Sequence, residues 1–199
     1  MGGPIIMSEL ISRTYDFSES ISATADKISG YASVFYDGSP KTEYKIGPNH
    51  YERISRDAFT GSIQNKKDVI ASYDHKYDQV LARTSAGTLN LSIDSKGLRY
   101  EFAYDGTDPD HQRCLAKIKR KEVVGSSFTG KSLNELWTKE NDRFIKTITE
   151  IDLMEVAPVV FPAYSGTKRS DELSPSEVRQ VELLETEMLL NSLDKILSH

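Results

Sequence analysis

The chain has 199 residues, with 25 Lys and Arg against 30 Asp and Glu and a formal net charge of −5. This length is typical of one globular domain with appendages rather than two full domains. The sequence carries no basic stripe, which argues against nucleic acid as a partner. Because Cys114 is the only cysteine, an intrachain disulfide and a thiolate zinc cluster are both excluded.

The apolar runs and the start of the chain bear on where the protein works. No run approaches the roughly 18 apolar residues that a membrane-spanning helix requires. The first residues also lack the basic start and long apolar core of a signal peptide. Together with the single cysteine, this predicts a protein of the reducing cytoplasm without a membrane segment.

The N-terminal part of the chain is dominated by strand patterns. Alternating apolar and polar residues predict two strands within residues 14–36 and another at 41–46, after a turn. Residues 51–63 differ, because their apolar residues recur at helical spacing. We expect a short helix there.

The next elements are an apolar strand and a hairpin. Residues 68–73 form an apolar strand that runs into His75, and residues 80–83 resume the strand pattern. Segments 88–94 and 98–104 alternate strictly on either side of a Ser-Lys-Gly turn. This pattern predicts a β-hairpin.

The C-terminal half combines strands with two helices. We expect a helix at 110–122 that Asp110 caps, followed by a strand at 123–128 and a polar segment at 133–141. Two further strands are expected at 143–151 and 153–161. A linker at 166–175 then leads to a helix at 176–197. The acidic residues and leucines of the last helix suit packing on the domain, on a second copy of the chain or on another protein.

Residues 123–132 carry two incompatible patterns. GSSFTGKS at 125–132 matches the phosphate-loop pattern G-x-x-x-x-G-K-[ST], whose backbone N–H groups cradle nucleotide phosphates. VVGSSF at 123–128 is instead typical of a strand that presents a nucleophilic serine. A phosphate loop needs a buried parallel strand before it and a helix starting at its Lys-Ser, but the residues that follow predict strands. We favour the strand, with a nucleotide-binding protein as the less favoured alternative.

A nucleophilic serine needs a general base, because a free hydroxyl is a poor nucleophile near neutral pH. The chain offers four histidines, His50, His75, His111 and His199. His199 is terminal, and His111 lies at the start of an expected helix. His75, at the end of an apolar strand, is the best placed of them to act as a base.

Six short sequence blocks follow one another along the chain. They are GYASVF at 30–35, RDAF at 56–59, DH at 74–75, DSKGLRYEF at 94–102, GSSF at 125–128 and EVAPVVFPAY at 155–164. Each block alone is weak, but six in one order are specific. In this order they resemble the prohead maturation proteases of tailed bacteriophages, over roughly residues 28–168.

The resemblance implies a fold and a set of site residues. The fold is that of the herpesvirus assemblins, an α+β and mainly β protein with a β-barrel surrounded by helices, here followed by a C-terminal helical tail. The resemblance further implies a serine protease without cofactor or metal, in which His75 would be the catalytic histidine and Ser127 the nucleophile. Ser126 remains an alternative, since adjacent strand residues face opposite sides and only one serine can meet His75. Glu155 would orient the imidazole, and backbone N–H groups or an arginine such as Arg143 could stabilise the oxyanion.

The resemblance also implies a biological role. Residues 1–13 would be an N-terminal extension, 14–168 the protease domain, and 169–199 a linker and C-terminal helix. The enzyme would cleave scaffold protein, major capsid protein or both, and itself, inside the immature procapsid in the bacterial host cytoplasm. A homodimer is expected, with no nucleic-acid or membrane partner. The linker at 166–175 is a candidate for self-cleavage and the tail helix for attachment to scaffold. The alternative is a catalytically inactive capsid-assembly module of the same fold.

Overall fold

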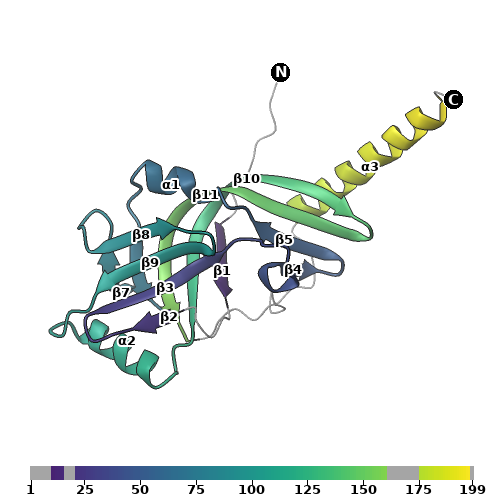
Figure 1. Cartoon of the computed structure of the whole chain (residues 1–199). Helices are drawn as coiled ribbons and strands as arrows, with labels where there is room; N and C mark the ends of the chain where they lie inside the picture. The colour runs from purple at the N-terminus through teal and green to yellow at the C-terminus, as the bar shows by residue number, and fades with distance from the viewer. Residues whose placement is uncertain (1–9, 16–20, 161–174, 198–199) are drawn as a thin grey trace.

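Two β-sheets and three α-helices make up the described part of the chain. The structure, a computed structural model, describes residues 10–15, 21–160 and 175–197. The larger sheet has the order β1-β10-β11-β5-β4, and β6 pairs with both β11 and β7. Its strands are β1 (Leu10–Tyr15), β4 (Tyr44–Gly47), β5 (His50–Ile54), β6 (Ile70–Tyr73), β7 (Lys76–Arg83), β10 (Gly125–Glu140) and β11 (Arg143–Val159). The smaller sheet is β2 (Ile21–Ala23), β3 (Lys27–Val34), β9 (Gly97–Ala103) and β8 (Leu89–Ile93), in that order. The α+β, mainly β class is confirmed (Figure 1).

The core lies between the two sheets. Ile28 and Leu98 of the smaller sheet and Phe128 and Val156 of the larger one are fully buried in a single apolar cluster. The ring of Phe59 meets that of Phe128 edge to face, with centroids 5.1 Å apart. Within the described residues both sheets keep open edges, so the closed barrel is not confirmed.

The described part of the chain has three α-helices, of which the first two lie against this core and the last lies away from it (Figure 1). They are α1 (Thr60–Gln64), α2 (Pro109–Lys119) and α3 (Pro175–Leu197), with a short 3-10 helix at Pro40–Thr42. The expected helix at 110–122 is confirmed as α2, although Asp108 rather than Asp110 caps it, accepting a 2.7 Å hydrogen bond from the Asp110 N–H. The expected tail helix is confirmed as α3. No helix in the described part of the chain has an apolar stretch long enough to cross a bilayer.

The helix expected at residues 51–63 is wrong over its first half. This stretch is β5, which pairs with β4 on one side and with β11 on the other, and only α1 is helical. Glu52 in the middle of β5 is fully buried. A strand that is buried on both faces is normally recognised by a continuous apolar run. The buried but charged Glu52 interrupts that run, so the strand could not be recognised in the sequence.

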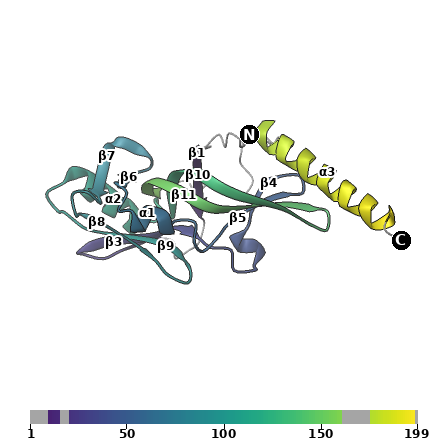
Figure 2. The ribbon, with the colours of Figure 1, turned by 90° about the horizontal axis from the view of Figure 1, so that it is seen from above.

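The polar segment at 133–141 is part of a long hairpin. β10 and β11 pair from Gly125 opposite Val159 to Glu140 opposite Arg143, with register shifts after Thr129, Ser132 and Asn134. Past a bulge near Ser132 the hairpin leaves the core as an arm, and β4, β5 and α3 lie beside it (Figure 1, Figure 2). Both faces of β10 in the arm are largely exposed, which explains why no strand pattern was visible.

The same pairing rules out the phosphate loop. Residues 125–132 are continuous strand in β10, hydrogen-bonded between β1 and β11. Their backbone N–H groups therefore belong to a β-ladder, and no helix begins at Lys131 and Ser132. Such a segment cannot wrap a phosphate group.

A buried cluster of charges joins α3 to the arm. Lys146 of β11 is only 1% exposed, and its Nζ lies 3.1 Å from Glu177 of α3, 3.4 Å from Glu135 and 3.7 Å from Glu52. Arg13 of β1 binds Glu52 with two hydrogen bonds, one of them 2.7 Å long. Burial lowers the pKa of Lys146, but the three carboxylates more than offset it and the net pKa is raised. Lys146 is therefore a charged residue inside the protein.

Lys146→Met should destabilise the protein by about 3–5 kcal/mol, because it leaves buried carboxylates without their cation. The measurement is urea unfolding followed by circular dichroism. Lys139→Met on the same hairpin is the matched control, since Lys139 is exposed and its nearest carboxylate, Glu185, is 4.0 Å away. Equal stabilities for the two variants would contradict a buried ionic role for Lys146.

Candidate active site

His75 lies in the tight turn that joins β6 to β7. Asp74 and His75 both have positive φ angles, 54° and 58°, as a two-residue type I′ turn requires. Neither residue is glycine, so the turn stores backbone strain. The Asp74 N–H donates to the Pro158 carbonyl at 2.9 Å, and the Val160 N–H donates to the Asp74 carboxylate at 3.1 Å. The turn is thus fixed on the end of β11.

Ser127 meets His75 from the neighbouring part of the sheet. The Ser127 Oγ lies 2.8 Å from the His75 Nε2. Ser126 faces the other side of β10, where its Oγ lies 2.9 Å from the hydroxyl of Tyr100. Of the two candidate serines, only Ser127 is brought to the histidine.

Glu155 completes a hydrogen-bonded chain. It lies on β11, and its Oε2 is 2.9 Å from the His75 Nδ1. A carboxylate at this nitrogen requires the Nδ1–H tautomer, which leaves Nε2 free to accept the proton of Ser127. The order hydroxyl, imidazole, carboxylate is the arrangement in which a serine becomes a nucleophile.

Two further hydroxyls contact this chain. The buried Ser72 of β6 donates to the Oε1 of Glu155. Thr129, two residues after Ser127, has its Oγ1 3.4 Å from the His75 Nδ1. Neither was identified from the sequence. The available signal was a serine inside the apolar strand that leads to His75.

The carboxyl group of Glu155 stays ionised although it is only 1% exposed. Burial raises the pKa of Glu155. Hydrogen bonds from His75 and Ser72, together with the charge of His75, lower it by more than burial raises it, so the net pKa is below the ordinary value of 4.5. An ionised Glu155 can orient the imidazole and stabilise its protonated form.

The lowered pKa of Glu155 predicts a pH-dependent stability. The ionised carboxylate stabilises the folded state fully above the ordinary pKa of 4.5, and this contribution is lost as the pH falls through the lower folded-state pKa. The stability difference between wild type and Glu155→Gln should therefore be constant well above pH 4.5 and shrink as the pH falls from 4.5 through the lower folded-state pKa of Glu155. Urea unfolding at each pH measures it. A difference that does not change with pH would contradict the ionised state.

The other titratable candidates have structural roles. His111 packs inside the protein, with its Nε2 2.6 Å from the Leu81 carbonyl oxygen. His50 stacks on Phe144, with ring centroids 5.1 Å apart. His199 lies outside the described residues. Burial raises the pKa of the Cys114 thiol to about 12, so this cysteine is not a thiolate nucleophile.

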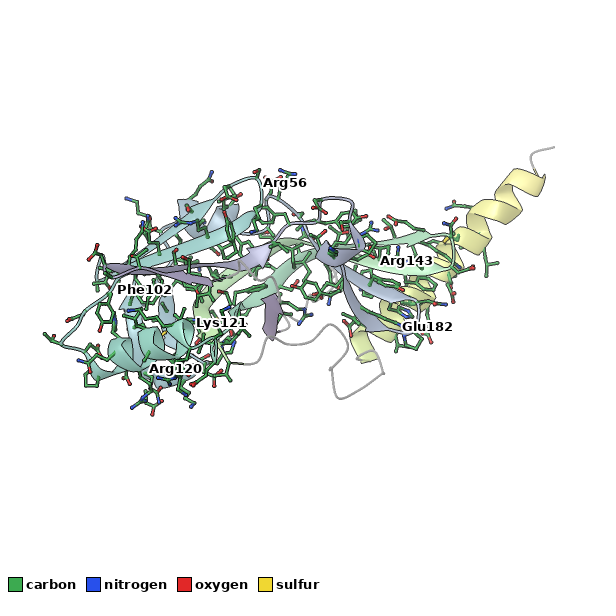
Figure 3. All side chains as sticks on the ribbon, turned by 60° about the horizontal axis from the view of Figure 1, so that its bottom comes forward. Arg56, Phe102, Arg120, Lys121, Arg143 and Glu182 are labelled. Atoms are coloured by element: carbon green, nitrogen blue, oxygen red, sulfur yellow. The ribbon has the colours of Figure 1, made fainter. Side chains whose placement is uncertain are left out.

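Arg143 is not at the site, which corrects its candidacy as an oxyanion donor. It lies at the tip of the arm, bonded to Glu43, with its guanidinium carbon 3.7 Å from the centre of the Tyr51 ring. Figure 3 shows Arg143 beside α3, at the opposite end of the molecule from Phe102. Within the described residues, no cluster of three or more metal-binding side chains is found.

Comparisons with known proteins place the chain in a family. The sequence model described as caudovirus prohead serine protease matches residues 13–183. One similar solved structure is the capsid assembly protease gp21 of bacteriophage T4, at 10% identity and a TM-score of 0.49, over 78% of this chain and 99% of that one. A search of curated proteins gives no sequence match. The chain belongs to the caudovirus prohead serine protease family.

Proposed function

We propose that Ser127 is the nucleophile of this protease, His75 its general base and Glu155 the carboxylate that orients His75. The observation that carries the proposal is the continuous hydrogen-bonded chain from the Ser127 Oγ through both ring nitrogens of His75 to Glu155. Family membership supports it, because a serine protease needs a serine activated in this way.

The reaction follows from the geometry. His75 Nε2 takes the proton of Ser127 as the Oγ bonds to the carbonyl carbon of a substrate peptide. The resulting imidazolium is stabilised by Glu155 and gives its proton to the leaving amine as the C–N bond breaks. His75 then takes a proton from water as the water oxygen bonds to the acyl carbon, and returns that proton to the Ser127 Oγ as the acyl C–O bond breaks, which releases the new carboxyl terminus.

The substrates that fit this family are capsid proteins. We propose that the enzyme acts inside the immature procapsid on scaffold protein, major capsid protein or both, and that peptide-bond cleavage makes maturation irreversible. Self-cleavage within the linker at 166–175 belongs to the same proposal, and residues 166–174 of that linker lie outside the described residues. The homodimer and the domain boundaries at 13 and 168 remain predictions. Within the described residues, strand β1 spans the first boundary.

Co-expression with the scaffold and major capsid proteins of the same phage tests the proposed function. Intact-mass analysis of each protein should reveal defined new termini in at least one of them with wild type and none with Ser127→Ala. Loss of mass from the protease itself would identify self-cleavage. If wild type cleaves none of the proteins, the inactive assembly module is favoured, and the exposed apolar residues of α3, such as Leu189 and Leu190, become its candidate contacts.

A further inference from the structure

Glu155 is hydrogen-bonded through both of its carboxylate oxygens. Its Oε2 lies 2.9 Å from the His75 Nδ1, and its Oε1 accepts a hydrogen bond from the hydroxyl of Ser72. Ser72 is 0% exposed and Glu155 is 1% exposed, so this contact is protected from competing water. The hydrogen-bonded chain from Ser127 to Glu155 is thus continued by a buried hydroxyl, at the carboxylate oxygen that His75 does not use.

The main chain brings Ser72 and His75 to the same carboxylate. Ser72 lies on β6, and His75 lies in the turn that directly follows this strand. β6 pairs in parallel with β11, with Ile70 opposite Glu155. One segment of the chain therefore holds both oxygens of Glu155, the first through Ser72 and the second through His75.

A single hydrogen bond does not fix the plane of a glutamate carboxylate. The last torsion of a glutamate side chain is broad and roughly two-fold, so a carboxylate bonded to His75 alone could rotate away from the ring plane. A donor on Oε1 removes this freedom, because the two oxygens then have to point to two fixed partners. The hydroxyl of Ser72 is placed to do this.

We propose that Ser72 is a positioning residue of the reaction, and that its hydrogen bond holds Glu155 in the orientation in which Oε2 binds His75. This inference rests on the proposed function of Ser127, His75 and Glu155. The bond acts most strongly when His75 has taken the proton of Ser127, because an oriented carboxylate then stabilises the full charge of the imidazolium. Ser72 keeps its own proton throughout and does not touch the substrate.

Ser72→Ala should lower kcat for cleavage of capsid protein by about 10- to 100-fold, which corresponds to the loss of one hydrogen bond to a charged group. KM should not change, because the lost interaction acts on the transition state and not on substrate binding. Thr129, opposite Glu155 on β10, also hydrogen-bonds the carboxylate. The loss should therefore stay smaller than that caused by Glu155→Gln.

Ser62→Ala is the matched control. Ser62 is also buried and also binds β11, but its hydroxyl donates to the Ile151 carbonyl oxygen at 2.7 Å and accepts from the Leu153 N–H at 2.9 Å. It contacts the main chain of the strand rather than Glu155, so kcat should stay within about twofold of wild type. An equal loss of kcat in Ser62→Ala and Ser72→Ala would mean that any loosening of β11 slows the enzyme, which would overturn the positioning role.

Ser72→Cys separates the hydrogen bond from packing. A thiol is similar in size to a hydroxymethyl group but is a weak donor, so this variant should be slow like Ser72→Ala. It also provides the same comparison if Ser72→Ala does not fold, which circular dichroism checks. A kcat of Ser72→Cys equal to that of wild type would show that the hydroxyl is not needed.

The decisive comparison places Ser72→Ala in a Glu155→Gln background. If Ser72 acts through Glu155, its removal should lower kcat by less than about twofold there, because the carboxylate that it orients is already gone. Equal losses in the two backgrounds, or an unchanged kcat in Ser72→Ala alone, would overturn the inference and leave the protease function standing. If wild type neither cleaves capsid protein nor reacts with a fluorophosphonate, the proposed function fails and this inference fails with it.

Discussion

Ser127→Ala should lower kcat for cleavage of capsid protein by about 10⁶-fold, which is the loss expected when the nucleophile of a serine triad is removed. The reason is geometric, because the Ser127 Oγ is the hydroxyl at 2.8 Å from the His75 Nε2. The fold should be kept, since the substitution removes one oxygen. Product formation followed by mass spectrometry measures the loss, with circular dichroism as the check on folding.

Ser126→Ala is the matched control for this substitution. Ser126 is adjacent and equally buried, but its hydroxyl contacts Tyr100 on the opposite side of β10. Its removal should cost about 1–3 kcal/mol of stability by leaving the Tyr100 hydroxyl without this partner, and should change kcat only a few-fold. If cleavage stops with Ser126→Ala and persists with Ser127→Ala, the strand register described here is wrong.

Glu155→Gln should lower kcat by about 10³- to 10⁴-fold while the protein remains folded. The amide of glutamine can present its N–H₂ to the His75 Nδ1, which then accepts a hydrogen bond instead of donating one. This hydrogen bond favours the tautomer of His75 that carries its proton on Nε2, and in that tautomer Nε2 cannot accept the proton of Ser127. The neutral amide also cannot stabilise the imidazolium that forms during the reaction.

Glu150→Gln controls for the loss of one negative charge from the same strand. Glu150 is exposed on β11 and should tolerate the change with kcat within about twofold of wild type. Initial rates with capsid protein as substrate, measured for both variants at several pH values, separate the two effects. Equal activity of Glu155→Gln and Glu150→Gln would remove Glu155 from the mechanism.

The strands that could be predicted from sequence are those with one buried face. β8 and β9 alternate because Leu98, Tyr100 and Phe102 point into the core while their neighbours face outward. The long arm could not be recognised, because β10 there has no buried face, and β5 was misassigned because its buried face includes Glu52. An apolar sequence pattern identifies the buried face of a strand only when the side chains on that face are apolar.

The candidate site residues that could be predicted from the sequence are those that lie within the blocks resembling the protease family. The blocks indicated His75, Glu155 and Ser127, with Ser126 as the alternative, and the fold brings Ser127 rather than Ser126 to the histidine. Ser72 and the Arg13 carbonyl could not be found this way. Ser72 is 83 residues from Glu155 in the chain, and Arg13, whose carbonyl oxygen contacts the Ser127 hydroxyl, is 114 residues from Ser127. No local sequence spacing can therefore reveal these contacts.

If His75 activates Ser127 as a nucleophile, Ser127 should react covalently with a reagent that is specific for activated serines. Protein that is competent to cleave capsid protein would be treated with a fluorophosphonate, and the modified residue identified by peptide mass mapping. We expect a single adduct on Ser127, which is absent in Ser127→Ala and forms much more slowly in His75→Gln. An adduct on Ser126, or active protein that forms no serine adduct, would contradict it.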